Sequence, residues 1–241
     1  MKKLAFISLL LLAGCSHGDD LFRSYGPETT ETRSVGDFRK IVAGEKFDIV
    51  LVQDSARAGT VEMTAGSNVI DGYVTKVVND ELQIRNENKF NWVRRLNIRQ
   101  KVVVYFKTID HLQINGSAKF TSRDSIIHTG TLEINHGGLE DAELTVRGDY
   151  IFANCSNTGG VKLSGSCFLF SGSVDDISFV DNRRLNAKKT FLTSYSRADS
   201  YVNGLEELNL RLFGVGNLYY SIPPSNALHI EDTGEGSVIK Y

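Results

Sequence analysis

A degenerate repeat constrains the fold of this chain more than any other feature. Each copy has two apolar residues separated by one residue, and a small residue two positions after the second, as in Leu112-Gln-Ile114-Asn-Gly116. The small position recurs at residues 116, 136, 154, 172, 194, 214 and 234, in steps of 18 to 22 residues, although His136 and Asn154 occupy two of these places. A period of this length is typical of a solenoid, in which each repeat buries its apolar face against its neighbours.

A second short apolar run lies between successive copies, so strand-like segments recur at half the period of the repeat. Antiparallel strands in a sandwich or barrel explain that spacing but not the longer period. The coils of a parallel β-helix explain both, so we predict a parallel β-helix over residues 111–241, with Asn115 and Asn135 stacked as an amide ladder. The apolar residues predicted to stack along one inner face are Ile114, Ile134, Phe170, Leu192, Leu212 and Ile230.

Residues 35–110 contain further strand-like runs, such as 47–52 and 102–106. β-branched and aromatic residues dominate these runs, and Gly, Asn, Asp and Ser separate them, which predicts strands. No stretch has the period of an amphipathic helix. We therefore expect an all-β chain in which residues 35–110 form a β region that is continuous with the solenoid and covers its first end.

The first 14 residues resemble a secretory signal peptide. Lys2 and Lys3 precede an apolar run from Leu4 to Leu12 that is too short for a permanent membrane span. The junction Leu12-Ala13-Gly14-Cys15 is similar to a bacterial lipobox, which predicts cleavage before Cys15 and attachment of acyl chains such as palmitate to that residue. Two or three acyl chains anchor a protein firmly to a membrane, so we expect a lipoprotein of the cell envelope, attached to the outer membrane.

Residues 15–34 are polar, contain Gly26 and Pro27, and lack an apolar period, which predicts a flexible tether. Removal of Lys2 and Lys3 with the leader leaves 25 basic residues against 29 acidic ones, a net charge of −4. This acidic balance argues against nucleic-acid binding, which needs a basic surface.

Cys155 and Cys167 are the cysteines that remain after Cys15. An exported protein can form disulfides, but both residues also neighbour strand-like runs, where buried free thiols are equally consistent. No CxxC or HxxxH spacing accompanies them, so we predict no metal site.

The densest charged group combines Asp175-Asp176, Asp181 and Arg183-Arg184. Carboxylates beside basic residues are the groups that polysaccharide lyases and hydrolases use, so this group is the best candidate for an active site. A solvated loop between coils is the interpretation that we favour. No motif of a nucleophile, a P-loop or a dinucleotide site is present, and we predict no catalytic, cofactor-binding or metal-binding residues.

The run Ile114-Asn115-Gly116-Ser117-Ala118, followed by its repeats, resembles the auto-transporter adhesin, head-GIN domain family. The resemblance covers residues 35–241, and the pair Asp19-Asp20 after the lipobox is similar to the surface-export signal of Bacteroidetes lipoproteins. The family resemblance implies a right-handed parallel β-helix and a role in adhesion at the cell surface. It defines no catalytic residues.

These observations predict a non-catalytic lipoprotein that presents a β-helix surface for adhesion or for binding a glycan or a protein. The alternative is a polysaccharide-active β-helix enzyme. We also expect a weak homodimer through the C-terminal coil, because residues 236–241 form a strand whose only charged edge residue is Lys240.

Overall fold

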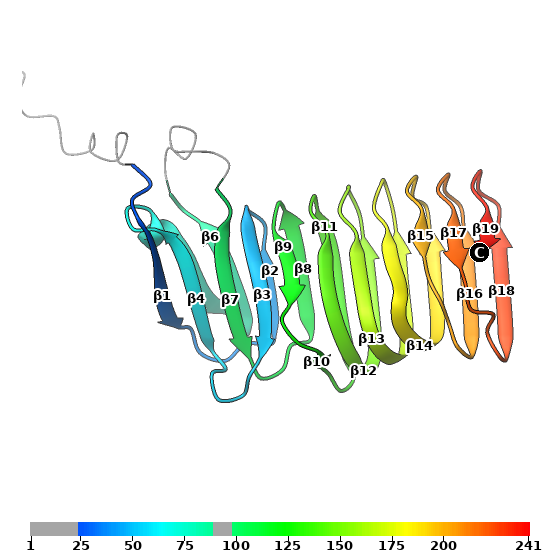
Figure 1. The fold of residues 1–241 in the computed structure, drawn as a ribbon, viewed down its shortest axis with the longest axis horizontal. Coiled ribbons are helices and arrows are strands. Elements are labelled where there is room, and N and C mark those ends of the chain that lie inside the picture. Colours follow the sequence, from blue (N-terminus) through cyan, green and yellow to red (C-terminus); the bar gives the residue numbers. More distant parts are fainter. Residues whose placement is uncertain (1–23, 89–97) are drawn as a thin grey trace, which may run out of the picture.

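The computed structural model describes residues 24–88 and 98–241 as an elongated stack of strands (Figure 1). It confirms the predicted all-β fold and the parallel β-helix. The signal peptide, Cys15 and Trp92 lie outside the described residues. The strands are β1 (Glu28–Ser34), β2 (Lys40–Ala43), β3 (Phe47–Gln53), β4 (Thr60–Gly66), β5 (Tyr73–Val78), β6 (Glu81–Asn86), β7 (Gln100–Phe106), β8 (His111–Gly116), β9 (Lys119–Ser122), β10 (Ile126–Ile127), β11 (Thr131–Gly138), β12 (Ala142–Cys155), β13 (Val161–Val174), β14 (Val180–Ser194), β15 (Ser200–Tyr201), β16 (Glu207–Leu212), β17 (Leu218–Tyr220), β18 (Ala227–Asp232) and β19 (Val238–Lys240), and a single 3-10 turn, η1 (Ile70–Gly72), lies between β4 and β5.

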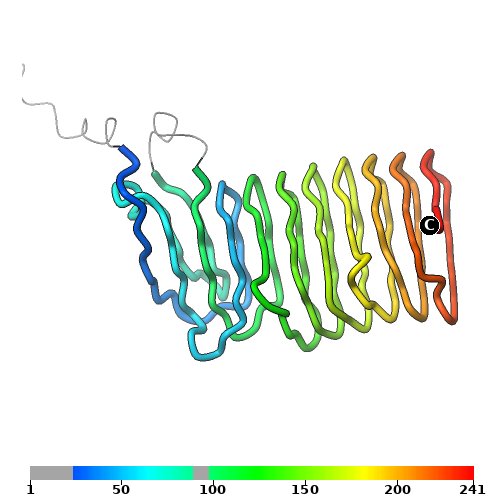
Figure 2. Tube along the Cα trace, in the orientation of Figure 1, coloured from blue at the N-terminus to red at the C-terminus, as the bar shows by residue number. Residues whose placement is uncertain are grey.

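Two rows of strands enclose the core. The first row runs in the order β5, β6, β2, β8, β11, β12, β13, β14, β16 and β18. The second row runs in the order β1, β4, β7, β3, β9, β12, β13, β14, β15, β17 and β19. The long strands β12, β13 and β14 bend between the rows and belong to both, so the coils follow one another along the axis (Figure 2).

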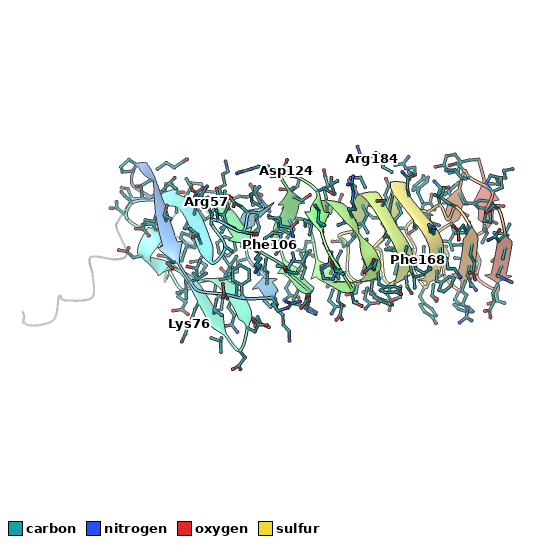
Figure 3. All side chains as sticks on the ribbon, turned by 90° about the horizontal axis from the view of Figure 1, so that it is seen from below. Arg57, Lys76, Phe106, Asp124, Phe168 and Arg184 are labelled. Atoms are coloured by element: carbon teal, nitrogen blue, oxygen red, sulfur yellow. The ribbon has the colours of Figure 1, made fainter. Side chains whose placement is uncertain are left out.

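The register confirms the coil length. Residues aligned from coil to coil are Ile114, His136, Cys155, Val174, Ser194, Leu212 and Asp232, so each coil takes 18 to 22 residues. Side chains alternate between the interior and the outer faces, as in a half-buried strand. The burial of β11 follows this alternation along most of its length, and side chains project from the outside of the whole stack (Figure 3).

The predicted inner stack is correct in orientation and wrong in register. Ile114, Ile134 and Phe170 are fully buried. However, Ile134 pairs with Leu112, and Ile114 pairs with His136. The coil between them is two residues longer than the repeat suggested, and a shift of two residues keeps a side chain on the same face of a strand. Leu192 and Leu212 are also buried.

The amide ladder is shifted in the same way. Asn135 aligns with Gln113 and Asn154, not with Asn115. Its Oδ1 accepts a hydrogen bond of 3.1 Å from Nδ2 of Asn154, whose own Oδ1 accepts from the Ser173 hydroxyl at 3.0 Å. The ladder therefore lies on the outer face of the first row.

The glycines of the repeat do not share one role. Gly116 has a φ of 51°, and a Cβ there would lie 1.7 Å from the carbonyl oxygen of Gly44, so only glycine fits this turn. Gly172 instead lies inside β13, where a Cβ would meet the Ala153 carbonyl oxygen at 2.6 Å. Gly172 is not among the glycines with positive φ, and it serves close packing between coils.

The N-terminal end is covered by antiparallel strands. β1 pairs with β4, β4 pairs with β7, and β5 pairs with β6. β1 begins at Glu28, inside the segment predicted to be a tether, so that prediction is wrong for residues 28–34. Its side chains alternate between exposed and half-buried, which explains why the sequence shows no apolar period there.

The C-terminal end carries no such cover within the described chain. Ile230, predicted to be buried, is 45% exposed, and Leu228 in the same strand is 42% exposed. Both continue interior columns of the first row. They are exposed because β18 is the last strand of that row.

Candidate ligand-binding surface

The charged group selected from the sequence divides into two parts. Asp181 and Arg183 lie on β14 and form an ion pair of 2.5 Å. Arg183 also lies over the ring of Tyr201, with 4.4 Å between the guanidinium carbon and the ring centroid. Burial works against the charged form of Asp181, yet the hydrogen bonds from Arg183 hold its pKa below the usual value. This pair is satisfied by its own contacts and leaves little for a ligand.

Asp175 and Asp176 lie elsewhere, in the connection from β13 to β14. Together with residues 157–158, Ile177, Tyr195 and Arg197 they line an open groove of about 480 Å³, which we call the corner groove. Its walls come from three successive coils at the corner that joins the first row to the second. The volume falls within the range of small-ligand sites, ~300–1,000 Å³.

Backbone bonds fix the three corners against one another. The Ile177 N–H donates to the Asn157 carbonyl, and the Arg197 N–H donates to the Asp176 carbonyl at 2.8 Å. Asp176 adopts a φ of 55°, and its Oδ2 accepts a hydrogen bond from the Asn157 N–H at 3.1 Å. These ladders between coils give the groove a rigid floor.

Hydrogen bonds to the backbone hold several side chains of the groove and leave other polar atoms available for a ligand. Asp175 Oδ1 accepts from the Asp176 N–H at 2.8 Å, and Asn157 Nδ2 donates to the Gly137 carbonyl at 2.7 Å. Within residues 24–88 and 98–241, the second oxygen of each aspartate, the Asn157 Oδ1 and the Arg197 guanidinium have no hydrogen-bond or ion-pair partner. The groove thus offers acceptors on side chains that hydrogen bonds hold in place, and one donor group, the Arg197 guanidinium.

Tyr195 is the aromatic wall of the groove. Its ring is 54% exposed and stacks on Phe213 of the next coil, with centroids 5.2 Å apart and planes inclined by 20°. Stacking against a neighbour fixes the ring without burying its outer face. In the sequence, Tyr195 directly follows the small position of its repeat, Ser194, and belongs to no motif. Tyr195 follows Asp175 by 20 residues, which is the length of one coil. This separation is the sequence signal that could have placed the two residues side by side.

Two other grooves each contain an arginine that is already ion-paired within the protein. One is lined by residues including Asp48, Arg99 and Glu140, where Arg99 bonds to both carboxylates, at 2.6 and 3.3 Å. The other contains Arg39, which pairs with Asp110. Neither has unpaired charges arranged around an exposed aromatic ring.

Further aromatic side chains lie on the outside of the solenoid. Tyr150 and Phe168 meet edge to face, with centroids 6.0 Å apart, and Phe168 is labelled among the later coils in Figure 3. Tyr201 and Tyr219 stack with centroids 4.9 Å apart near the C-terminal end. We call Tyr150 and Phe168 the aromatic pair of the first row.

Cys155 and Cys167 are free, buried thiols, which settles the alternative left open by the sequence. Cys155 lies in the first row, where it aligns with His136 of β11. Cys167 lies outside the first row, because it aligns with Gly148, which precedes the part of β12 that pairs with β11. Burial raises the pKa of each thiol to about 12, so both stay protonated and behave as small apolar side chains. In the part of the chain that is described, no three His, Cys, Asp or Glu residues are grouped to hold a metal ion.

No helix among the described residues is long and apolar enough to cross a membrane. The predicted lipid attachment at Cys15 concerns a residue outside that part of the chain.

Comparison with known proteins agrees with the fold. The family model for "Putative auto-transporter adhesin, head GIN domain" matches residues 37–224. A solved structure of a "putative adhesin" from Bacteroides fragilis has a TM-score of 0.82 at 18% identity, covering 89% of this chain and 97% of that one. A "putative adhesin" and a "putative lipid binding protein" from Parabacteroides distasonis have TM-scores of 0.64 and 0.60, at 17% and 18% identity, each covering 89% of this chain and 98% of its own.

No curated protein matches the chain. At 17–18% sequence identity, the solved structures show that the fold is shared. The family model covers most of the sequence. The chain therefore belongs to the auto-transporter adhesin, head GIN domain family.

Proposed function

We propose that this protein is a non-catalytic lipoprotein of the cell envelope that presents the outside of its β-helix for adhesion. Acyl chains on Cys15 hold it to the outer membrane, and the solenoid projects its side chains toward a glycan or a protein. Membership of an adhesin family supports the surface location.

The exposed aromatic side chains on a rigid solenoid carry this proposal. Tyr195, Phe213, Tyr150 and Phe168 all lie outside the core, although their burial would stabilise the fold. Aromatic residues are enriched in binding surfaces, because they supply large contact areas at a small cost in side-chain entropy. Their arrangement as ring pairs holds these contact areas in place.

Adhesion is tested with the full chain displayed on a non-adherent bacterial host. Cells that carry the wild-type protein should bind immobilised mucin and extracellular matrix, and cells with Cys15→Ala should lose both the membrane association and the binding. Equal membrane association of the Cys15→Ala protein contradicts the anchor, and equal adherence of cells with and without the protein contradicts the adhesive role.

The alternative enzyme is tested separately, on pectin, alginate and glycosaminoglycans. We expect no time-dependent release of unsaturated or reducing sugar ends. Release that disappears in Asp175→Ala would replace the adhesive role with a polysaccharide-active one.

A further inference from the structure

The corner groove combines an aromatic face with unpaired hydrogen-bonding groups. Phe213 stacks on one face of the Tyr195 ring, and Tyr195 remains 54% exposed and lines the groove, so the other face of the ring is open to a ligand. The electron-rich face of an aromatic ring attracts the weakly positive C–H groups of an apolar surface. A sugar ring presents such a C–H surface on one side and hydroxyl groups around its edge.

The polar groups stand where hydroxyls of such a ring would meet them. Asp175, Asp176 and Asn157 each keep an oxygen without a partner in the described chain, and Arg197 keeps its donors. Each aspartate and the asparagine is also held by one hydrogen bond to the backbone. Side chains that are fixed before binding lose less entropy when a ligand arrives.

The charge of the groove selects among glycans. Two carboxylates face one guanidinium, so the groove has a net charge of −1. Uronic-acid and sulfated polysaccharides carry negative charges that these carboxylates would repel. A neutral hexose chain avoids that repulsion and can still use every acceptor.

A protein partner fits this groove less well. Stable protein interfaces bury ~800 Å² on each side around an apolar centre. The corner groove has two exposed apolar residues, Tyr195 and Ile177, and otherwise polar walls. The aromatic pair of the first row lies near the other corner of the coil, where the second row passes into the first, and does not line this groove.

We propose that the corner groove binds a neutral glycan, with one hexose ring stacked on Tyr195 and its hydroxyls bonded to Asp175, Asp176 and Arg197. This inference rests on the proposed binding role and names the class of ligand for it. Because the coils continue on both sides of the groove, the glycan chain can extend along the solenoid in either direction.

The test uses the full-length lipoprotein, solubilised in a detergent without a sugar headgroup. Its migration is measured in native gels that contain mannan, galactomannan or xyloglucan as neutral probes, and heparin or alginate as charged ones. At least one neutral probe should retard the protein, while the charged probes leave it unaffected. Retardation by heparin or alginate alone, or by none of the probes, overturns the proposal.

Variants then locate the site. Tyr195→Ala should weaken retardation by the neutral probe by about ten-fold or more, since the stacking contact is lost. Tyr195→Phe should remain within about three-fold of wild type, because the ring and its stack on Phe213 are kept. Tyr241→Ala is the matched control, since Tyr241 is an aromatic residue outside the groove that is 54% exposed, like Tyr195, and the variant should leave binding unchanged. Equal losses in Tyr195→Ala and Tyr241→Ala would overturn the assignment of the site.

The carboxylates give a second readout. The double variant Asp175→Asn with Asp176→Asn keeps hydrogen-bond acceptors but removes the negative charge, so heparin should begin to retard the protein. Circular dichroism checks that the variants keep their strand content.

The adhesion assay on cells separates this inference from the adhesive role. Adherence that persists in Tyr195→Ala overturns the groove and leaves adhesion standing. Adherence that requires Tyr195 but survives periodate oxidation of the target's sugars identifies a protein ligand and overturns the glycan.

Discussion

The two ends of the solenoid bury equivalent residues to very different degrees. At the N-terminal end, β4 lies between β1 and β7, and its Val61, Met63 and Ala65 are fully buried. At the C-terminal end, Ile230 continues an interior column but is 45% exposed. Burial in a solenoid therefore depends on the presence of a neighbouring coil more than on the residue itself.

The interior also differs along the axis. Among the described residues up to Val174, the buried side chains are apolar except for those of Gln100, His128 and His136. The next coil and the start of the one after it bury a set of hydroxyls and amides, which are Ser178, Asn182, Thr190, Ser194, Ser196, Ser200 and Asn203. Most of these groups have hydrogen-bond partners, such as the Asn203 carbonyl for the Thr190 hydroxyl at 2.6 Å. This stretch thus adds polar pairing to the apolar packing, and the coil after it is again apolar inside, with Leu208, Leu210 and Leu212 fully buried.

The largest expected effect compares two isoleucines of one interior column. Ile134→Ala removes a fully buried side chain and should lower the free energy of unfolding by about 2–5 kcal/mol. Ile230→Ala should lower the free energy of unfolding by less than about 1 kcal/mol. Ile230 is already 45% exposed, so its truncation loses little buried area and leaves no enclosed cavity. Urea denaturation of both variants measures the difference. Equal losses would show that the last coil is covered in solution.

The next effect concerns Asn182, one of the buried polar residues between Ser178 and Asn203. Its side chain is fully buried, and neither its Oδ1 nor its Nδ2 has a partner in the described chain. Asn182→Leu should therefore stabilise the fold by about 1–3 kcal/mol, by removing two unsatisfied polar groups.

The matched control for this change is Asn203→Leu. Asn203 is also buried, but its Oδ1 accepts hydrogen bonds from the Ser221 and Ile222 N–H groups, at 2.9 and 3.0 Å. Its loss should destabilise the fold by about 1–3 kcal/mol. Thermal unfolding compares the two variants, and destabilisation by both would show that Asn182 has a partner such as a buried water molecule.

A smaller effect depends on pH. His136 is buried between Ile114 and Cys155. Its Nε2 lies 2.7 Å from the Glu140 carbonyl oxygen, and its Nδ1 accepts from the Gly138 N–H at 3.3 Å. These partners fit the neutral ring, and burial lowers its pKa.

The unfolded chain therefore binds more protons than the folded chain at acidic pH. The stability that the neutral ring contributes should be fully present above pH ~6.5 and decline as the pH falls below that value. Thermal unfolding between pH 5 and 7.5 measures this slope, which should become shallower in His136→Met. A slope that the variant leaves unchanged would assign the pH dependence to other groups.

The weakest expected effect is association through the open end. Within the described residues, β18 pairs only with β16 and β19 only with β17, and Leu228 and Ile230 are exposed on β18. Strand edges without a neighbour favour pairing with another chain, and two-fold symmetry is the most common way for identical chains to close. We propose a weak homodimer through this coil.

Sedimentation of the detergent-solubilised protein tests the dimer. A concentration-dependent increase in mass should disappear after Ile230→Asp, while Glu28→Lys at the covered end should leave it unchanged. A protein that stays monomeric at high micromolar concentration, or a dimer that persists in Ile230→Asp, contradicts the proposal.

Much of the fold was predictable because each coil of a solenoid repeats a similar spacing of apolar residues along the chain. The 18–22-residue coil, the strand class and the inward orientation of Ile114, Ile134 and Phe170 all follow from apolar spacing. The register was not predictable from the glycines, because Gly116 meets a need for positive φ and Gly172 a need for space. One residue type satisfies both needs, so it marks no unique position in the coil.

Only part of the candidate site could be predicted from the sequence. Asp175 and Asp176 stood out as a charged pair, but Asp181 and Arg183 in the same group turned out to satisfy each other. Tyr195 and Arg197, one coil later, carried no local signal.

The sequence by itself determined the period, the all-β class and the residues that face inward, because alternation and repeat length are local properties of a strand. The tertiary structure alone decided which coil lies over which, and therefore that Tyr195 and Arg197 stand beside Asp175 and Asp176. It also decided that Ile230 is exposed, since burial in a stack is a property of the neighbouring coil and not of the residue.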